Sequence, residues 1–516
     1  MLPKLIKYFF LSVKWLAFFI GLPILLALLW MMLKSFGDIG TDVSKKDLGF
    51  TLELQQAEQP DTLPNILLIM ADDLGYADLG CYGSTSIKTP NLDSLAKQGM
   101  RFTDHYAGAS VCSPSRVALM TGRYPVRAGV SSVMTPTDLP YSKKFMWHIG
   151  KIFNRMGAVD MGADSKFNGI RHKEITLAEA LKQAGYATGM AGKWHLGDLK
   201  TRPAFNPMYH GFDDFLGLNA ANDEFPAALF DRDSLLIEDV GLNQDFLTRI
   251  FTERAIQFIK NNQAKPFFYF LSFTAPHLPL VPTEKFKNTS EGGIYGDVVE
   301  EMDWYIGQVL QTLSEQGVAD NTIVLFTSDN GPWFKGSPGE YRGRKGQSFE
   351  GGYRVPFIAK WEGHIRPESV CTAPVMNFDV YPTLLNIVGL ELPSDRIIDG
   401  KDLQPLWTNQ TDKSPHEALF FYHFDQVEAV RAANWKYIAT TNHYIWPILL
   451  DRKGLISHDL AEPWFGRQYP NLYDLEKDPG ENYDLQHHQP AIVNDLSEKI
   501  ANWERSIEQN PYGWKN

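Results

Sequence analysis

The feature that most constrains the fold is a series of apolar runs that stop abruptly at polar residues, with helical patterns between them. Short runs rich in Ile, Val, Phe and Tyr are typical of strands buried in a sheet. Strands that alternate with helices form a sheet covered by helices, so the sequence predicts an α/β sandwich. The expected strands are residues 65–70, 186–192, 266–276 and 321–328, and the expected helices are residues 92–99, 176–185, 246–261, 297–317 and 376–389.

Polar residues follow each of the four expected strands at the point where its apolar run ends. In α/β sheets, ligands bind at the carboxyl ends of the strands, so these residues should meet at one edge. Each ending alone is weak evidence, because a carboxylate after a strand often caps a turn and a lone histidine is often structural. Four such endings together predict a polar site that holds a hard cation. The residues are Asp72 and Asp73, Lys193 and His195, His277, and Asp329 and Asn330.

The chemistry of these side chains narrows the kind of site. Asp72, Asp73, Asp329 and Asn330 offer only oxygen ligands, which suit Ca²⁺ or Mg²⁺ rather than zinc. A divalent cation surrounded by hydrogen-bond donors and cationic side chains binds a tetrahedral oxyanion. The sequence therefore indicates sulfuryl or phosphoryl transfer, in which a protein mainly positions groups and neutralises charge. The donor and cationic groups are Arg116, Lys193, His195, His277 and Lys345.

Cys112 lies in the stretch SVCSPSRVALMTGR, at an unusual position for a cysteine. Pro114 and the helix-forming residues after it place Cys112 at a helix N-terminus, where backbone N–H groups attract anions. A buried thiol, half of a disulfide, a metal ligand and a nucleophile all remain open. The chain has only three cysteines, which disfavours a disulfide framework, and Cys81 and Cys371 are expected to be buried free thiols. A soft thiol beside hard oxygen ligands is mismatched, which suggests that Cys112 does not stay a cysteine.

The first 35 residues are separate from the expected fold. The stretch from Trp15 to Leu33 is apolar and uncharged, and its length suits a helix that crosses a bilayer. Lysines before this stretch predict that the N-terminus stays inside and that the rest of the chain is exported. We interpret residues 1–35 as an uncleaved membrane anchor and residues 36–61 as a tether, with a cleaved signal peptide as the alternative.

The remaining sequence divides into a large part and a small part. Residues 62–415 carry the strand–helix alternation and form the expected main domain. Residues 416–516 contain short strand-like pieces and an amphipathic tail, which predict a smaller α+β subdomain. Residues 131–175 interrupt the alternation and are either a lid or a surface insertion. The net charge of −12 argues against a nucleic-acid partner, which requires a basic surface.

The pattern CSPSR followed by LMTGR resembles the signature of the type I sulfatases, in the alkaline phosphatase superfamily. The resemblance extends over residues 62–485 and includes PNILLIMADDLGYADLGCYG, GKWHLGD, TAPHLPL, FTSDNGPW and KGQSFEGGYRVPFIAKWEG. It implies a large mixed β-sheet sandwiched by helices, with the smaller C-terminal α+β subdomain beside it. It also implies an arylsulfatase-like enzyme that hydrolyses a sulfate ester to an alcohol and sulfate.

The resemblance also implies a modified residue and a metal. In this family a formylglycine-generating enzyme oxidises the signature cysteine to Cα-formylglycine, so Cys112 is expected to be a precursor rather than a working thiol. The hydrated aldehyde is the nucleophile. A divalent cation, Ca²⁺ in preference to Mg²⁺, would be held by Asp72, Asp73, Cys112, Asp329 and Asn330.

The other site residues take their roles from the same resemblance. Arg116 would orient the aldehyde hydrate. His195 would take a proton from the second hydroxyl of the hydrate after the first hydroxyl has attacked sulfur, so that sulfate leaves and the aldehyde is regenerated. Lys193, His277 and Lys345 would bind the sulfate oxygens, with Lys345 nearest the leaving group.

Two alternative functions stay open at this point. A phosphonate or phosphate ester hydrolase of the same superfamily can share the formylglycine, and a non-catalytic binder of sulfated ligands would need only the anion site. The expected partners are a sulfated small molecule or saccharide and the formylglycine-generating enzyme. The membrane is a third partner, through the N-terminal helix, with the catalytic domain on the periplasmic or other extracytoplasmic side. An aryl, sugar or steroid sulfate would each fit the same sulfate site.

Overall fold

The computed structural model describes residues 54–56, 62–134, 169–200, 202–441 and 470–515. The expected anchor at Trp15 to Leu33, all but residues 54–56 of the expected tether, and most of the insert at residues 131–175 lie outside the described residues. Among the helices that the structure describes, none is both long enough and apolar enough to cross a bilayer.

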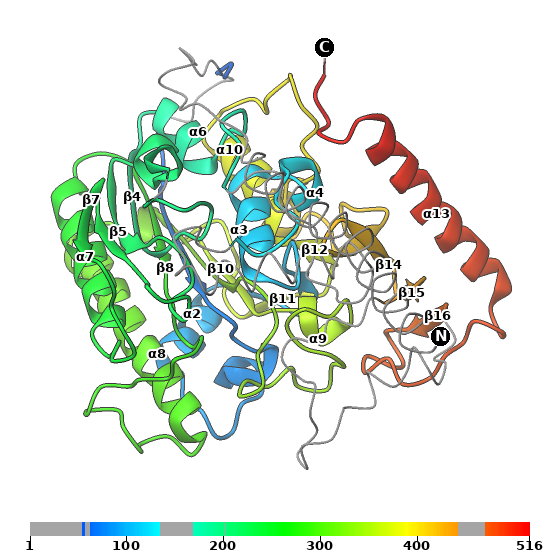
Figure 1. Ribbon diagram of the computed structural model, residues 1–516, viewed down its shortest axis with the longest axis horizontal. Coiled ribbons are helices and arrows are strands. Elements are labelled where there is room, and N and C mark those ends of the chain that lie inside the picture. The colour runs from blue at the N-terminus through cyan, green and yellow to red at the C-terminus, as the bar shows by residue number, and fades with distance from the viewer. Residues whose placement is uncertain (1–53, 57–61, 135–168, 201, 442–469, 516) are drawn as a thin grey trace, which may run out of the picture. The chain divides into compact units, whose positions relative to one another are not determined.

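Five parallel strands form the centre of a ten-stranded sheet (Figure 1). Every residue of these strands is buried, as expected for apolar strands covered on both faces. Four of the five confirm the predicted strands, with ends that differ by a few residues. The fifth, β5, is short and contains Asp and Gly, so no clear apolar run marks it. Their order is β9 (Thr322–Ser328), β1 (Asn65–Ala71), β8 (Phe267–Ser272), β4 (Ala187–Lys193) and β5 (Asp214–Leu218).

Five further strands make the sheet mixed, which confirms the predicted architecture. Beyond β9 the order continues with β10 (Phe357–Lys360), β2 (Met100–Phe102) and β11 (Ser369–Cys371), of which β10 is antiparallel to β9. Beyond β5, β6 (Leu229–Asp231) and β7 (Ser234–Ile237) continue the sheet as antiparallel strands. These strands are too short to show a hydrophobic period, and they were not predicted. A separate small sheet pairs β3 (His105–Tyr106) with β12 (Val375–Met376).

Helices cover both faces of the sheet (Figure 1). Alternate side chains of β1 point to opposite faces, so Ile66 and Leu68 pack in one core while Leu67 and Ile69 pack in the other. The first core includes α3 (Cys112–Thr121), α6 (Leu177–Gln183) and α10 (Val380–Ile387), and the second includes α2 (Pro90–Gln98), α7 (Leu247–Asn262) and α8 (Gly293–Glu315). All six confirm predicted helices. Shorter helices are α4 (Pro125–Ala128), α9 (Glu350–Tyr353) and α11 (Gln404–Trp407).

A smaller antiparallel sheet follows in the C-terminal part of the chain. It consists of β13 (Leu419–His423), β14 (Gln426–Ala432), β15 (Trp435–Ile438) and β16 (Asn471–Asp474). The helix α13 (Pro490–Gln509) packs its apolar side, including Leu496 and Ile500, into the same core as Phe421 of this sheet. These elements confirm the smaller α+β unit, while its boundary at residue 416 stays a prediction.

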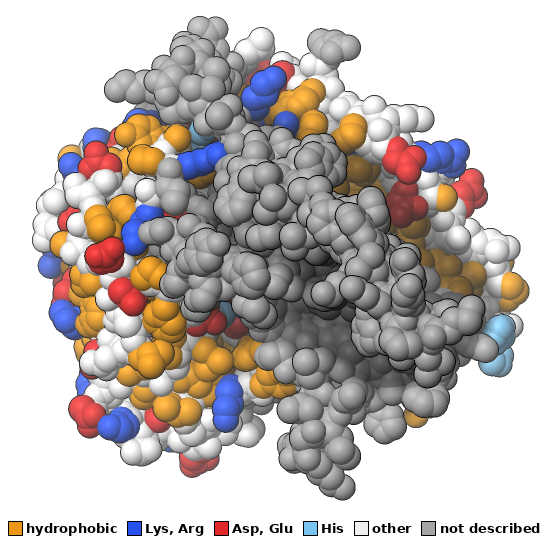
Figure 2. Space-filling model, in the orientation of Figure 1, with side chains coloured by type: hydrophobic (Ala, Val, Ile, Leu, Met, Phe, Trp, Pro, Cys, Tyr) orange, Lys and Arg blue, Asp and Glu red, His pale blue; other side chains and the backbone are white. Residues whose placement is uncertain are grey.

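The outer sides of α7 and α8 carry charged side chains where these helices face water. Over α7 and α8, Figure 2 shows charged side chains of both signs interspersed with apolar ones. One example is the exposed ion pair between Arg249 and Glu253 on α7. A helix that packs on a sheet with one side and faces water with the other has this distribution.

Candidate active site

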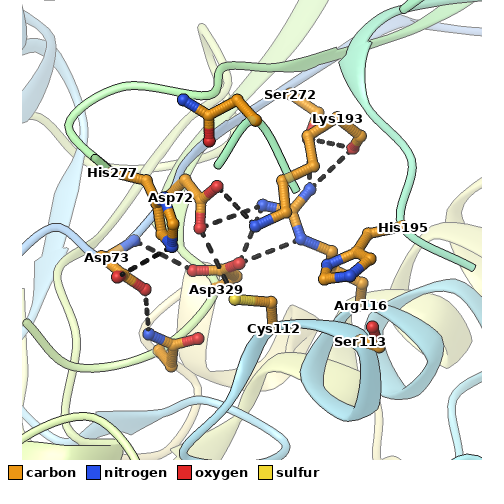
Figure 3. A network of polar contacts seen from close by, with 12 residues as sticks. Asp72, Asp73, Cys112, Ser113, Arg116, Lys193, His195, Ser272, His277 and Asp329 are labelled. Atoms are coloured by element: carbon orange, nitrogen blue, oxygen red, sulfur yellow. Dashed lines mark hydrogen bonds and ion pairs between the residues drawn. The ribbon is translucent and has the colours of Figure 1, made fainter. Parts of the chain in front are cut away.

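All the site residues predicted from the sequence lie together at one edge of the central sheet (Figure 3). The strands β9, β1, β8 and β4 are adjacent and parallel, so their carboxyl ends share that edge. The helix α3 adds residues from its first turns, and the loop between β9 and α9 adds a lysine. The residues are Asp72, Asp73, Cys112, Arg116, Lys193, His195, His277, Asp329, Asn330 and Lys345.

Three carboxylates and one thiol form the centre of the site. One oxygen from each of Asp72, Asp73 and Asp329 and the sulfur of Cys112 all lie within 4.8 Å of one another. Asp73 has a positive φ of 63°, and its backbone N–H donates to Asp329 Oδ1 over 3.1 Å. Asn330 Nδ2 donates to Asp73 Oδ1 over 2.7 Å, whereas the buried Asn330 Oδ1 accepts no hydrogen bond from the residues that the structure describes. A buried amide oxygen without a donor fits a metal ligand.

Arg116 links the carboxylates to two neighbouring strands. Its Nε and Nη2 donate to Asp329 Oδ2 over 2.9 and 2.8 Å, and its Nη1 donates to the Lys193 carbonyl over 2.7 Å and to Ser272 Oγ over 2.6 Å. Burial opposes the charge of Arg116, but Asp329 and Asp72 outweigh this and raise its pKa above the ordinary value. The guanidinium is therefore charged and fixed in orientation beside the first turn of α3.

Lys193, Lys345 and His277 surround the carboxylates from the other side. Lys193 Nζ lies 2.6 Å from Asp72 Oδ2, Lys345 Nζ lies 2.8 Å from Asp73 Oδ2, and His277 Nε2 lies 3.6 Å from the same Asp73 oxygen. Burial disfavours the charge of both lysines, yet the nearby carboxylates raise their pKa values. Lys193 is fully buried, whereas the side chains of Lys345 and His277 are 11% and 10% exposed. Lys345 and His277 are therefore the partly exposed members of this group.

His195 is held in one tautomer by its surroundings. Its Nε2 lies 2.8 Å from the carbonyl oxygen of Met134, which can only accept, so Nε2 carries the proton. The other ring nitrogen, Nδ1, is buried and has no hydrogen-bond partner in the described part of the chain. Burial, reinforced by Lys193 and Arg116, lowers the pKa of His195 well below its ordinary value. The ring is therefore neutral, with a free lone pair on Nδ1 that can accept a proton.

Cys112 begins α3, as predicted, and its sulfur lies 3.7 Å from Asp72 Oδ1. Burial raises the pKa of the Cys112 thiol far above its ordinary value, so the unmodified residue is a protonated thiol and a weak nucleophile. All three cysteines are free. Cys371 is buried, as expected, but Cys81, in the short 3-10 turn Gly80–Tyr82, is only half-buried, so the expectation of a buried thiol at Cys81 is wrong.

The charges of the site suit a divalent cation together with an anionic substrate. The carboxylates of Asp72, Asp73 and Asp329 lie close to three permanent cations, so the side chains alone are nearly balanced. A divalent cation among the carboxylates would give the site a positive charge, which favours an anion such as a sulfate ester. The permanent cations are Arg116, Lys193 and Lys345.

Sequence analysis missed several residues that lie beside the predicted ones. Ser272 Oγ donates to the Lys193 carbonyl over 2.8 Å and accepts from Arg116, and its position at the end of an apolar run could have revealed it. Ser113 Oγ accepts from the Met134 backbone N–H over 3.1 Å, next to the carbonyl that binds His195. Glu224 Oε2 lies 3.8 Å from His195 Nε2, and no local pattern in the sequence distinguishes this glutamate from a surface residue.

Comparison with known proteins identifies the family to which this site belongs. A family model described as Sulfatase matches residues 64–390, and one described as N-sulphoglucosamine sulphohydrolase, C-terminal, matches residues 343–506. The chain belongs to the sulfatase family. This sulfatase is 34% identical to the steryl-sulfatase of Mus musculus, over 82% of this chain and 78% of the mouse protein. It is also 34% identical to the N-acetylgalactosamine-6-sulfatase of Mus musculus, over 86% of this chain and 85% of that protein.

Solved structures agree with this assignment. A structure from Bacteroides thetaiotaomicron, reported under the metabolism of multiple glycosaminoglycans, is 27% identical and superposes with a TM-score of 0.70 over 86% of this chain and 99% of that one. The phosphonate monoester hydrolase of Agrobacterium radiobacter is 20% identical with a TM-score of 0.54, over 86% of this chain and 96% of that one, and shares the fold alone. The predictions of the family, the fold class and sulfate ester hydrolysis are confirmed.

Proposed function

We propose that this sulfatase hydrolyses sulfate esters through Cα-formylglycine formed from Cys112, with Ca²⁺ held beside it. One observation carries the proposal: the Cys112 side chain lies within 4.8 Å of the potential ligand oxygens of Asp72, Asp73 and Asp329. A thiol is a poor partner for a hard cation, whereas an aldehyde hydrate offers oxygen. When formed, the hydrate supplies two hydroxyl groups on one carbon, one to attack sulfur and one to lose a proton.

The cation would be held by Asp72, Asp73, Asp329 and Asn330, together with an oxygen of the modified Cys112. The carboxylates and the unpartnered Asn330 Oδ1 support this ligand set. All these ligands are oxygen atoms, the ligand type that hard cations such as Ca²⁺ prefer. When bound, the cation supplies positive charge that stabilises the attacking and transferred oxygens.

The basic side chains would bind and orient the sulfate group. Arg116, fixed by Asp329, lies on the α3 side and keeps residue 112 in position. Lys193 is fully buried and would contact a deep sulfate oxygen. Lys345 and His277 are at the exposed side of the site, so they lie where the alcohol part of the substrate extends toward solvent. This arrangement supports Lys345 as the residue nearest the leaving group.

His195 would act as the base. Its Nε2–H is committed to the Met134 carbonyl, which leaves Nδ1 as the only ring nitrogen with a lone pair. Nδ1 can therefore take the proton from the second hydroxyl at residue 112, and the neighbouring cations Lys193 and Arg116 favour its prompt release.

An assay with two aryl esters tests the proposal. The chain produced together with a formylglycine-generating enzyme should hydrolyse 4-nitrophenyl sulfate faster than 4-nitrophenyl phosphate. Chelation of the cation should lower the rate of sulfate ester hydrolysis at least about 100-fold, because the site then loses the positive charge that stabilises the negative charge on the reacting oxygens. Added Ca²⁺ should restore the rate, and Mg²⁺ should restore less because it demands a stricter geometry.

A binding measurement separates metal binding from turnover. Ca²⁺ should raise the melting temperature of the chelated chain, because a ligand that binds only the folded state stabilises it. In the Asn330→Ala variant, half-maximal stabilisation should need more Ca²⁺, whereas the control variant Arg249→Ala should respond like the unaltered chain. Faster hydrolysis of the phosphate ester, or full activity after the metal has been removed, would contradict the proposal.

We further propose a sulfated small molecule or saccharide as the substrate and a formylglycine-generating enzyme as a partner. Relatives named steryl-sulfatase, arylsulfatase and N-acetylgalactosamine-6-sulfatase are all 34–35% identical to this chain. Overall similarity therefore does not favour one kind of alcohol over another. The kind of alcohol in the substrate has to be inferred from the residues of this chain that surround the sulfate-binding groups.

We also propose that Trp15 to Leu33 anchors the enzyme in a membrane, with the catalytic domain on the exported, periplasmic or extracytoplasmic side. The full chain should sediment with membranes and resist high salt, because an apolar span of about 20 residues inserts almost irreversibly. A shortened chain that starts at residue 50 should stay in the supernatant and keep its activity, since the first site residue is Asp72. A mature N-terminus beyond Leu33 would instead show that the segment is a cleaved signal peptide.

A further inference from the structure

The loop that follows β5 begins beside the catalytic lysine. β4 and β5 are parallel and pair Lys193 with Leu218, so residues 219–228 leave the sheet at the edge that carries the active site. Within the described part of the chain, three side chains of this loop have a buried polar atom without a hydrogen-bond partner. These atoms are Asn219 Nδ2, Asn222 Oδ1 and Glu224 Oε2.

Glu224 is the member of this loop that lies beside His195. Its Oε2 is 3.8 Å from His195 Nε2, which already donates to the Met134 carbonyl at 2.8 Å and is therefore not free to satisfy the glutamate. The side chain as a whole is 22% exposed, although Oε2 itself is buried. Glu224 is thus a partly exposed side chain beside the buried His195, close enough to Lys193 and Lys345 for their charges to act on its carboxyl group.

A buried carboxyl oxygen without a partner is costly, so a site that retains one is suited to a ligand that supplies the missing hydrogen bond. Burial, helped by the neighbouring Asp223, raises the pKa of Glu224 to about 8 despite the opposing charge of Lys193. A neutral carboxyl group both donates and accepts. A hydroxyl group does the same, and it can pair with this side chain in either protonation state.

We propose that Glu224 is a specificity residue whose carboxyl group binds a hydroxyl group on the alcohol part of the substrate. The preferred substrates are then sulfated saccharides, which carry further hydroxyl groups near the sulfate ester, rather than esters of flat alcohols without a further hydroxyl. This inference rests on the proposed function, because it places the alcohol relative to a sulfate group held by Lys193, Lys345 and His277.

The test compares two classes of substrate across matched variants of the full, modified chain. The probes are 4-nitrophenyl sulfate and a set of monosaccharide sulfates, namely the 6-sulfates of galactose, N-acetylgalactosamine and glucosamine. Glu224→Ala should lower kcat/KM for the best monosaccharide sulfate by roughly 10- to 100-fold, mainly through KM, because one hydrogen bond to a substrate hydroxyl is lost. Hydrolysis of 4-nitrophenyl sulfate should stay within about threefold.

Two further variants distinguish binding from a structural role. Glu224→Gln keeps a group that donates and accepts, so it should retain most of the activity toward the monosaccharide sulfate. Asp223→Ala removes the exposed neighbouring carboxylate and should change neither activity. For an analogue of the best monosaccharide sulfate that lacks the contacted hydroxyl, the unaltered chain and Glu224→Ala should have similar kcat/KM values.

Several outcomes would overturn this inference. An equal loss on both classes of substrate would show that Glu224 acts through His195 or through the fold, and no loss on either class would show that it contacts no substrate. Hydrolysis of 4-nitrophenyl sulfate without hydrolysis of any monosaccharide sulfate would also overturn it, while leaving the proposed function intact. A modified chain that hydrolyses neither class would instead contradict the proposed function itself.

Discussion

Replacing Cys112 with alanine should abolish turnover while leaving the fold intact. Loss of a catalytic nucleophile lowers kcat by roughly 10⁴-fold or more, because binding and positioning alone cannot replace it. The fold should survive because Cys112 is in the first turn of α3, and within the described part of the chain the one hydrogen bond of its sulfur is long, at 3.7 Å to Asp72 Oδ1. Activity on 4-nitrophenyl sulfate and the thermal melting curve measure the two halves of this expectation.

Cys371 provides the matched control for this variant. It is also buried and free, but it lies in β11, the outermost strand of the sheet, away from the four strands whose ends carry the candidate site. Cys371→Ala should lose stability like any small core truncation and keep its activity. An active Cys112→Ala variant would show that residue 112 is not the nucleophile. An inactive Cys371→Ala variant would show that removing a buried thiol can abolish activity by disturbing the fold alone.

Replacing Arg116 with methionine should cause the largest loss of stability of any single change in the site. Arg116 is almost completely buried and donates two hydrogen bonds to Asp329, and its removal leaves this buried carboxylate short of donors. Breaking a buried ion pair in this way costs about 3–5 kcal/mol of unfolding free energy. Activity should fall as well, because Asp329 would no longer be held in place.

The midpoint of urea unfolding measures this effect, with metal and protein concentrations held constant. Arg249→Met is the matched control, because Arg249 forms an exposed pair with Glu253 on α7. Its loss should change the unfolding free energy by less than about 1 kcal/mol. If Arg116→Met unfolded at the same urea concentration as the unaltered chain, the contacts of Arg116 would be dispensable and their proposed role wrong.

The structural elements that could be predicted from the sequence are those marked by long apolar runs and by the polar residues that follow these runs. β1 is followed by Asp72 and β9 by Asp329, and parallel neighbouring strands bring both to one edge. The start of α3 could also be predicted, because a proline two residues after Cys112 fits the first turn of a helix. Both rules depend on local sequence and on general properties of parallel sheets.

The parts that could not be predicted depend on contacts between distant segments. The strands β6 and β7 are too short to show the alternation of apolar and polar residues that marks a strand. The number of strands in the sheet could therefore not be predicted from the sequence. The tautomer of His195 depends on the backbone carbonyl of Met134, which is far from His195 in the chain. Every residue has such a carbonyl, so the sequence cannot indicate which one binds the histidine. The position of Glu224 beside His195 likewise follows from the pairing of β5 with β4.

The chemical state of residue 112 is the most direct test of the proposed function. Trypsin should release the peptide from Phe102 to Arg116, and its mass reports that state. In an active preparation, the peptide should have lost one sulfur and two hydrogen atoms and gained one oxygen atom, and it should react with an aldehyde reagent. A fully active preparation whose peptide still contains an unmodified cysteine would contradict the account.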